Sequence, residues 1–148
     1  DGTRIEPLFS PDDHPAERIS ELLQGAQESI YFLAYSFTTD DFGEALIERF
    51  KSGVTVAGVM EADQVRSNQG TEYDKLLQAG LDVRLDGNPE YMHHKIFIID
   101  GETVILGSYN FSASAETRND ENVLIIHNRT VAQEFVREFE RIYSLAAP

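Results

Sequence analysis

The chain has 148 residues, 41% of them hydrophobic and 26% charged, and its formal net charge is -14. A chain of this length is expected to form one domain that buries roughly 70% of its unfolded surface, and this composition excludes a disordered polypeptide. There is no cysteine, which excludes disulfides and thiolate zinc sites, and the apolar runs are far shorter than the ~20 residues of a membrane-spanning helix.

Apolar residues recur with helical or strand periods along the whole chain, starting with an amphipathic segment that contains Ile19, Leu22 and Leu23. The predicted helices cover 15–24, 40 or 41 to about 51, 72–79 and 130–145, and the predicted strands cover 30–37, 54–60, 81–85, 96–99, 103–106 and 122–127. The polar stretch 62–70 is predicted to be a loop.

Strands and helices that alternate with short connections are typical of an α/β domain. The early strand-helix-strand units predict parallel neighbours, whereas the run 96–106 predicts an antiparallel hairpin around Asp100 and Gly101. We therefore expect a mixed, largely parallel central sheet with helices on both faces. No internal repeat or linker interrupts the chain, so 1–148 is predicted to be a single domain.

Polar and charged side chains gather around this hairpin. Residues two apart on a strand face the same side, roughly 6.6 Å apart, so His93 and Lys95 should face one target while His94 faces away. The partner strand carries Ser108 and Asn110 past its own end. The residues of the hairpin region that we consider together are His93, Lys95, Asp100, Gly107, Ser108 and Asn110.

These six positions, with their gaps, match without substitution the HKD motif of the phospholipase D superfamily. The chain resembles the single-motif bacterial endonucleases of the Nuc type over nearly all of its length, and the segments 29–38 and 115–122 are weaker matches to that branch. The resemblance implies the phospholipase D-like fold, and a homodimer in which two chains each supply one His93 to a shared site on a two-fold axis.

The chemistry that this resemblance implies is the attack of a phosphodiester by histidine. One His93 would form a phosphohistidine and the other would protonate the leaving oxygen. Lys95 and Asn110 would stabilise the non-bridging oxygens, and Ser108 would donate a hydrogen bond to phosphate. Glu121 would accept a proton from the ring nitrogen of His93 that does not attack, although the neighbouring Asp120 remains an alternative.

Other candidate residues have structural or weaker functional interpretations. Asp100 and Gly107 are predicted to be structural members of the motif, with Asp100 tying together the turn or the dimer interface. The charge of the chain argues against a generic nucleic-acid binder, but a local cluster of cations can hold one phosphate. Candidates for this cluster are Lys95, Arg118, Arg66 and Arg84.

A metal site is not predicted, because adjacent histidines such as His93 and His94 diverge on a strand and three or four converging ligands would be needed. His14 and His127 lie outside any ligand pattern, and no cofactor is expected. The chain begins with Asp1 rather than Met, so its location in the cell stays open, and removal of an N-terminal export segment would imply an extracytoplasmic or periplasmic protein.

The sequence is compatible with three functions. The first is a metal-independent nuclease that hydrolyses DNA or RNA. The second is a lipid phosphodiesterase or phosphatidyltransferase with the same centre, for which the sequence offers no clear membrane-facing stretch. The third is a non-catalytic nucleic-acid or protein-binding module, against which the intact motif argues because binding alone does not require His93, Lys95 and Asn110 together.

Overall fold

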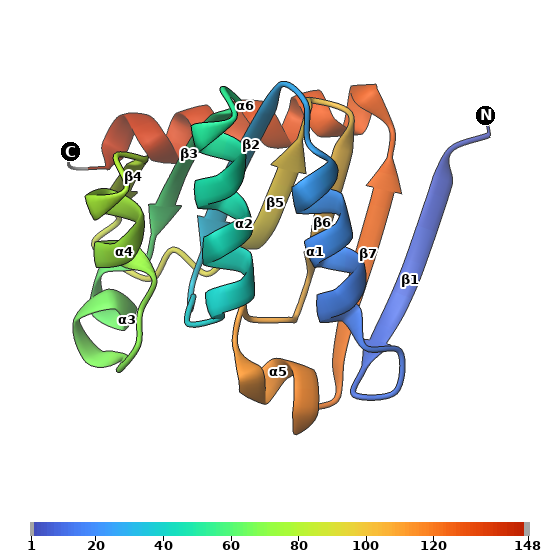
Figure 1. Cartoon of the computed structure of the whole chain (residues 1–148), viewed down its shortest axis with the longest axis horizontal. Coiled ribbons are helices and arrows are strands. Elements are labelled where there is room, and N and C mark those ends of the chain that lie inside the picture. Colours follow the sequence, from blue (N-terminus) through green and yellow to red (C-terminus); the bar gives the residue numbers. More distant parts are fainter. Residues whose placement is uncertain (1, 147–148) are drawn as a thin grey trace.

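A computed structural model describes residues 2–146 and contains one seven-stranded sheet (Figure 1). The strands are β1 (Arg4–Ser10), β2 (Ser29–Ala34), β3 (Thr55–Met60), β4 (Asp82–Leu85), β5 (Lys95–Ile99), β6 (Thr103–Gly107) and β7 (Glu121–His127). The helices are α1 (Pro15–Gly25), α2 (Asp40–Lys51), α3 (Ala62–Ser67), α4 (Tyr73–Gln78), α5 (Ala113–Thr117) and α6 (Arg129–Leu145). The strand order is β1-β7-β6-β5-β2-β3-β4.

The sheet is mixed, as expected, but it is not largely parallel. Only the pairs β2–β3 and β3–β4 are parallel, whereas β2–β5, β5–β6, β6–β7 and β1–β7 are antiparallel. The parallel pairs are those joined through helices, and the antiparallel half comes from the β5–β6 hairpin and the strands added beyond it. This correction matters for the site, because antiparallel neighbours bring strand starts and strand ends to the same edge.

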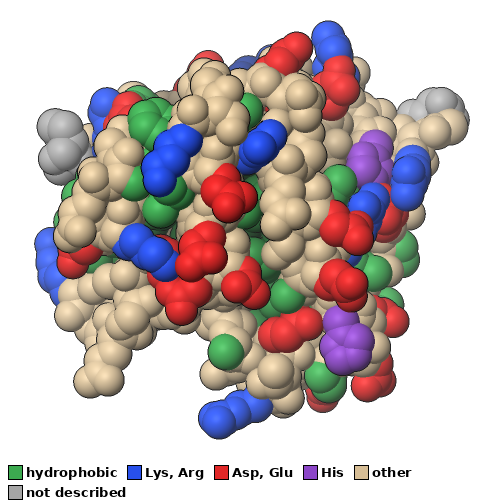
Figure 2. All heavy atoms as spheres, viewed as in Figure 1, with side chains coloured by type: hydrophobic (Ala, Val, Ile, Leu, Met, Phe, Trp, Pro, Cys, Tyr) green, Lys and Arg blue, Asp and Glu red, His purple; other side chains and the backbone are tan. Residues whose placement is uncertain are grey.

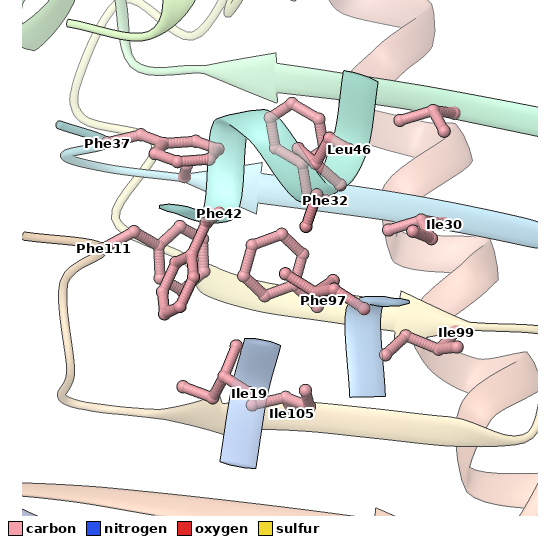
Figure 3. Close-up of a cluster of buried hydrophobic side chains, with 14 of the residues drawn as sticks. Ile19, Ile30, Phe32, Phe37, Phe42, Leu46, Phe97, Ile99, Ile105 and Phe111 are labelled. Carbon is pink, nitrogen blue, oxygen red and sulfur yellow. The ribbon is translucent and has the colours of Figure 1, made fainter. Parts of the chain in front are cut away.

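Helices cover both faces of the sheet and enclose two apolar layers. α1 and α2 lie over one face and α6 crosses the other (Figure 1). The α1/α2 side contains a cluster of phenylalanines, in which the rings of Phe97 and Phe111 stack with centroids 4.3 Å apart (Figure 3). On the α6 side, Phe139 stacks on Tyr31 of β2 at 4.8 Å. Both layers bury aromatic surface, which contributes strongly to stability.

Three elements, β1, α3 and α5, were not predicted from the sequence. β1 contains Pro7, which is tolerated there because β1 is an edge strand that pairs only with β7. α3 forms where a loop was expected. Its N-cap is Glu61, whose side chain accepts a hydrogen bond from the Gln64 amide at 2.6 Å. The N-cap of α5 is Ser112, whose hydroxyl accepts a hydrogen bond from the Ala115 amide at 3.4 Å. These caps stabilise helices too short to show a clear period.

Asp100 joins the β5–β6 turn to the start of β2. Its carboxylate accepts hydrogen bonds from the backbone amides of Gln27 at 3.0 Å, Glu28 at 2.7 Å and Ser29 at 2.9 Å. Asp100 itself has a φ of 53°, and Gly101 follows with a φ of 61°, as a tight hairpin turn requires. Asp100 therefore fixes the hairpin turn against the start of β2.

Gly107 allows the end of β6 to approach the start of β7. A Cβ atom at this position would lie 2.1 Å from the carbonyl oxygen of Asn122, and the φ of Gly107 is +153°. Any side chain would therefore push the two strands apart where Ser108 follows β6 and Glu121 begins β7.

We predict that Gly107→Ala lowers the free energy of unfolding by about 1–3 kcal/mol, because the added methyl overlaps a backbone carbonyl. The matched control is Gly25→Ala, where nothing lies within 4 Å of the added atom. The measurement is chemical denaturation of both variants and the parent. Equal stability of the two variants would show that the strands can separate without cost.

Candidate active site

The motif side chains meet at one edge of the sheet because of the antiparallel strand order. His93 comes just before β5, Ser108 comes just after β6, and Glu121 is the first residue of β7. The register places Ala34, the last residue of β2, opposite Lys95. Two strand starts and two strand ends therefore converge, and they bring together residues that are far apart in the sequence.

His93 and Lys95 contact each other directly at this edge. The Nζ atom of Lys95 lies 3.3 Å from Nδ1 and 3.4 Å from Nε2 of His93, and it donates a hydrogen bond to the His93 carbonyl at 3.0 Å. His93 is exposed, whereas only 8% of Lys95 is accessible. An ammonium group can donate to an imidazole nitrogen only where that nitrogen carries a lone pair, so this contact favours the neutral, nucleophilic ring.

The protonation of the pair is shifted by burial and by charge. The pKa of His93 is lowered, first by partial desolvation of the ring and then by the positive charge of Lys95 and the neighbouring His94. Burial also lowers the pKa of Lys95, and the negative charge of Glu121 acts in the opposite direction. His93 is therefore held in its neutral form more strongly than an ordinary histidine.

His94 faces the opposite side of the sheet, as the strand period predicts. Its Nε2 atom lies 3.0 Å from Glu138 of α6. His127 contacts Glu6 at 2.5 Å and Thr103 at 3.1 Å, and His14 lies 3.8 Å from Glu116. Each of these histidines thus has a local partner away from the Lys95 ammonium.

Ser108, Glu121 and Asn122 form a second polar cluster at the same edge. The hydroxyl of Ser108 donates to Glu121 Oε2 at 2.5 Å and accepts from the backbone amide of Asn122 at 3.0 Å. The other carboxylate oxygen of Glu121 accepts from Asn119 at 3.0 Å. In the described part of the chain, Glu121 therefore bonds to Ser108 and Asn119, while its charge acts on Lys95; its predicted bond to His93 is not among these contacts and stays a prediction.

Asn110 is held by the backbone that follows β6. The adjacent Phe111 donates its amide to the Ser36 carbonyl at 3.1 Å and forms an isolated bridge with Phe37. Within residues 2–146 the buried side-chain oxygen of Asn110 has no hydrogen-bond partner. Because buried polar atoms are nearly always paired, this acceptor oxygen remains available to a hydrogen-bond donor of a bound group.

Two of the predicted arginines, Arg66 and Arg84, pair with acidic side chains close to them in the sequence. Arg66 is exposed and pairs with Asp63 at 3.0 Å on α3. Arg84 pairs with Asp82 at 3.2 Å and lies 3.8 Å above the ring of Tyr143. Arg118 is exposed at the end of α5. Figure 2 shows acidic and basic side chains interspersed on the viewed face rather than a continuous basic stripe.

Tyr35 is a site residue that sequence analysis did not single out. Its ring lies 4.4 Å from that of His93, and Lys95 Nζ lies 4.9 Å from its centroid. Its hydroxyl accepts a hydrogen bond from Gln64 of α3 at 3.3 Å. The sequence signal was only its position one residue after β2, and its proximity to His93 depends on the pairing of β2 with β5.

Across 2–146, no three His, Asp or Glu side chains converge in a way that could hold a metal ion. No helix in that range is long and apolar enough to cross a membrane.

Comparison with known families gives a match over most of the chain. Residues 19–143 match the family model described as "Cardiolipin synthase, PLD-like domain". The chain is 32% identical over 128 residues to a mitochondrial cardiolipin hydrolase of Chlamydomonas reinhardtii, and 33% identical over 137 residues to a phospholipase D of Rickettsia prowazekii. These matches cover 86% and 93% of this chain but only 57% and 66% of the two relatives.

Solved structures show the same fold over the full length. The structure of Nuc from Salmonella typhimurium, described as a phospholipase D family member, superposes with a TM-score of 0.90 at 28% identity and covers 98% of this chain and 97% of that chain. NucT from Helicobacter pylori gives a TM-score of 0.90 at 21% identity and covers 98% of both chains.

We predict that Lys95→Met raises the pKa of His93, because the substitution removes a positive charge beside the ring while keeping a side chain of similar length. The measurement is an NMR titration of the His93 ring in the parent and the variant. Lys51→Met, at the exposed end of α2, serves as the control and should leave the titration unchanged. A His93 titration that is the same in all three proteins would contradict the contact with Lys95.

Proposed function

Because the chain belongs to the phospholipase D superfamily, through the PLD-like domain at residues 19–143, we propose that it is a metal-independent phosphodiesterase that hydrolyses DNA or RNA. The reaction would pass through a phosphohistidine at a site shared by two copies of the chain. The observation that carries this proposal is the Lys95 ammonium placed 3.3 and 3.4 Å from the two ring nitrogens of His93.

In the first step a neutral His93 attacks phosphorus. The new bond from nitrogen to phosphorus forms as the bond from phosphorus to the leaving oxygen breaks, and His93 of the partner subunit gives that oxygen a proton. In the second step the same partner histidine, now neutral, takes a proton from water. The resulting hydroxide attacks phosphorus, the bond to His93 breaks, and a phosphate monoester leaves.

The remaining motif residues would stabilise the charge on phosphate. Lys95 supplies a cation within reach of the His93 ring, and the side-chain NH2 of Asn110 supplies an uncharged donor. Ser108 would donate to phosphate only after its hydroxyl turns away from Glu121, to which it donates in this structure. In the proposed site each of these residues is present twice. A mostly buried ammonium interacts with a non-bridging oxygen more strongly than an exposed one, because less water screens the charge.

An uncovered apolar face offers a place for the second copy. Ile5, Pro7 and Phe9 alternate along one face of β1, and 54% of Ile5 and 57% of Phe9 are exposed. α6 packs over β2, β3, β5 and β6 and leaves these side chains open. Phe9 pairs with Asn122, whose amide donates to Ser108, so the face reaches the candidate site. Contiguous exposed apolar side chains of this kind often mark interfaces.

A lipid phosphodiesterase is the second candidate, and the comparisons supply its support. The family model carries the name of cardiolipin synthase, and the matched relatives are named cardiolipin hydrolase and phospholipase D. The same phosphohistidine chemistry would act on a different leaving group. Assays on plasmid DNA and on cardiolipin vesicles, run with the same protein, would separate the two functions directly.

We predict that His93→Asn lowers the rate of phosphodiester cleavage on the order of a thousandfold or more, because it removes the nucleophile and the acid together. Cleavage by the unmodified chain should persist in excess EDTA. The assay follows nicking of plasmid DNA, and His14→Asn provides the control for replacing a histidine away from the site. Loss of activity in EDTA would contradict the mechanism.

A mixing experiment tests whether two copies share one site. Unmodified protein and the His93→Asn variant are unfolded together and refolded in equal amounts. If each site needs two intact histidines, mixed dimers are inactive and about one quarter of the activity of the same total amount of unmodified protein remains. Independent sites would instead leave about one half.

The location of the interface is tested in the same assay. Phe9→Asp places a charge on the proposed apolar face and should convert dimer to monomer, as measured by sedimentation, with loss of cleavage. Leu77→Asp is the matched control, because Leu77 is 41% exposed on α4, away from this face. A Phe9→Asp variant that remained dimeric would place the interface elsewhere.

A further inference from the structure

A cavity of about 310 Å³ lies directly beside His93. It is formed between the segment 87–94 and the last turns of α6, and His93 and His94 stand in its wall. Its apolar wall is made by Tyr91, Met92, Ile142 and Leu145, and its polar wall by Asn88 and Arg141. The volume lies near the lower end of the range for pockets that hold small molecules or single rings.

An aromatic row connects this cavity to the reacting histidine. The ring of Tyr35 lies 4.4 Å from His93, and the ring of Tyr91 meets Tyr35 edge to face at 6.3 Å. Tyr91 is 60% exposed. The backbone carbonyl of Tyr91 accepts a hydrogen bond from Asn88 at 3.3 Å, which helps to hold this segment in place.

The charges around the cavity are already paired. Arg141 binds Glu138 through two nitrogens at 2.8 Å each, and the same carboxylate lies 3.0 Å from His94. The wall therefore offers no uncommitted arginine that would hold a second phosphate. An occupant next to the reacting phosphate must be held mainly by contact with rings and apolar side chains.

The cavity also depends on a close contact between its two walls. A Cβ atom on Gly87 would lie 2.0 Å from the carbonyl oxygen of Leu145. The absence of a side chain at Gly87 lets segment 87–94 approach the end of α6. The two walls are thus packed against each other at a fixed distance.

We propose that this cavity binds the nucleobase adjoining the scissile phosphate, with the base stacked against Tyr91, and that the substrate is therefore a single-stranded nucleic acid. This inference rests on the proposed nuclease function. Bases in a duplex are paired and stacked on one another, whereas bases of a single strand can be splayed onto aromatic side chains. Stacking also suits a chain with a net charge of -14, because it does not depend on a basic track.

The test uses single-stranded oligonucleotides with one cleavable phosphodiester, which carry either a base or an abasic sugar on each side of it. Tyr91→Ala should raise KM for the base-containing strand about tenfold and leave kcat nearly unchanged. Tyr91→Phe keeps the ring and should keep most of the affinity. Leu77→Ala, on exposed α4, is the matched control for loss of an apolar surface side chain.

The abasic strand separates loss of stacking from loss of chemistry. For the unmodified protein the abasic strand should show a raised KM, and Tyr91→Ala should add no further loss, because both changes remove the same contact. The same base-containing strand annealed to its complement should be cleaved less efficiently. These three results together support the inference.

Two outcomes would overturn the inference while leaving the nuclease proposal intact: equal KM values of Tyr91→Ala and the unmodified protein on the base-containing strand, or preference for the duplex. Cleavage of cardiolipin vesicles with no cleavage of any oligonucleotide would overturn the proposed function and the inference with it.

Discussion

The chemistry of this site depends on one ammonium group buried at the start of a strand. Burying a cation is costly unless other groups replace the water it loses. Only 8% of Lys95 is exposed. Its ammonium contacts the His93 carbonyl, the His93 imidazole and the face of the Tyr35 ring. None of these carries a negative charge, and Glu121 acts only through its field. A bound phosphate would supply the missing anion, and the cation that would bind it is already in position in the folded chain.

The hairpin geometry explains which parts of this arrangement were predictable. The two-residue period of a strand places Lys95 on the same side as His93, and it places His94 on the opposite side, against α6. The Asp100–Gly101 turn brings Ser108 back to the edge of the sheet where His93 lies. These are local rules, and the structure follows them. Tyr35 and the partners of Glu121 could not be predicted, because they depend on β2 pairing with β5 and on β7 joining β6. β1, α3 and α5 were missed because tertiary contacts and single caps, rather than periodicity, stabilise them.

The negative net charge of the chain does not prevent it from binding the proposed anionic substrate, because binding depends on contacts at short range. Two of the three arginines predicted to attract phosphate pair with carboxylates, Arg66 with Asp63 and Arg84 with Asp82, so these two contribute little field at a distance. Exposed charges separated by more than about 10 Å are largely screened at moderate salt. A partly buried ammonium is screened much less. Electrostatic steering would therefore be weak, and recognition would fall to contacts within a few ångströms of His93, where rings and one cation are concentrated.

In the proposed dimer, symmetry sets a condition on the two His93 side chains, because one must act as a nucleophile and the other as an acid. If two identical copies share the site, desolvation and the charge of Lys95 lower the pKa of both His93 rings equally, which favours two nucleophiles and no acid. The phosphodiester itself can break this equality. Its negative charge offsets that of Lys95 and stabilises a proton on one ring, and once that ring is charged, protonation of the second becomes less favourable. The substrate would thus divide two equivalent residues into a nucleophile and an acid, so that the catalytic state forms only when the anion is bound.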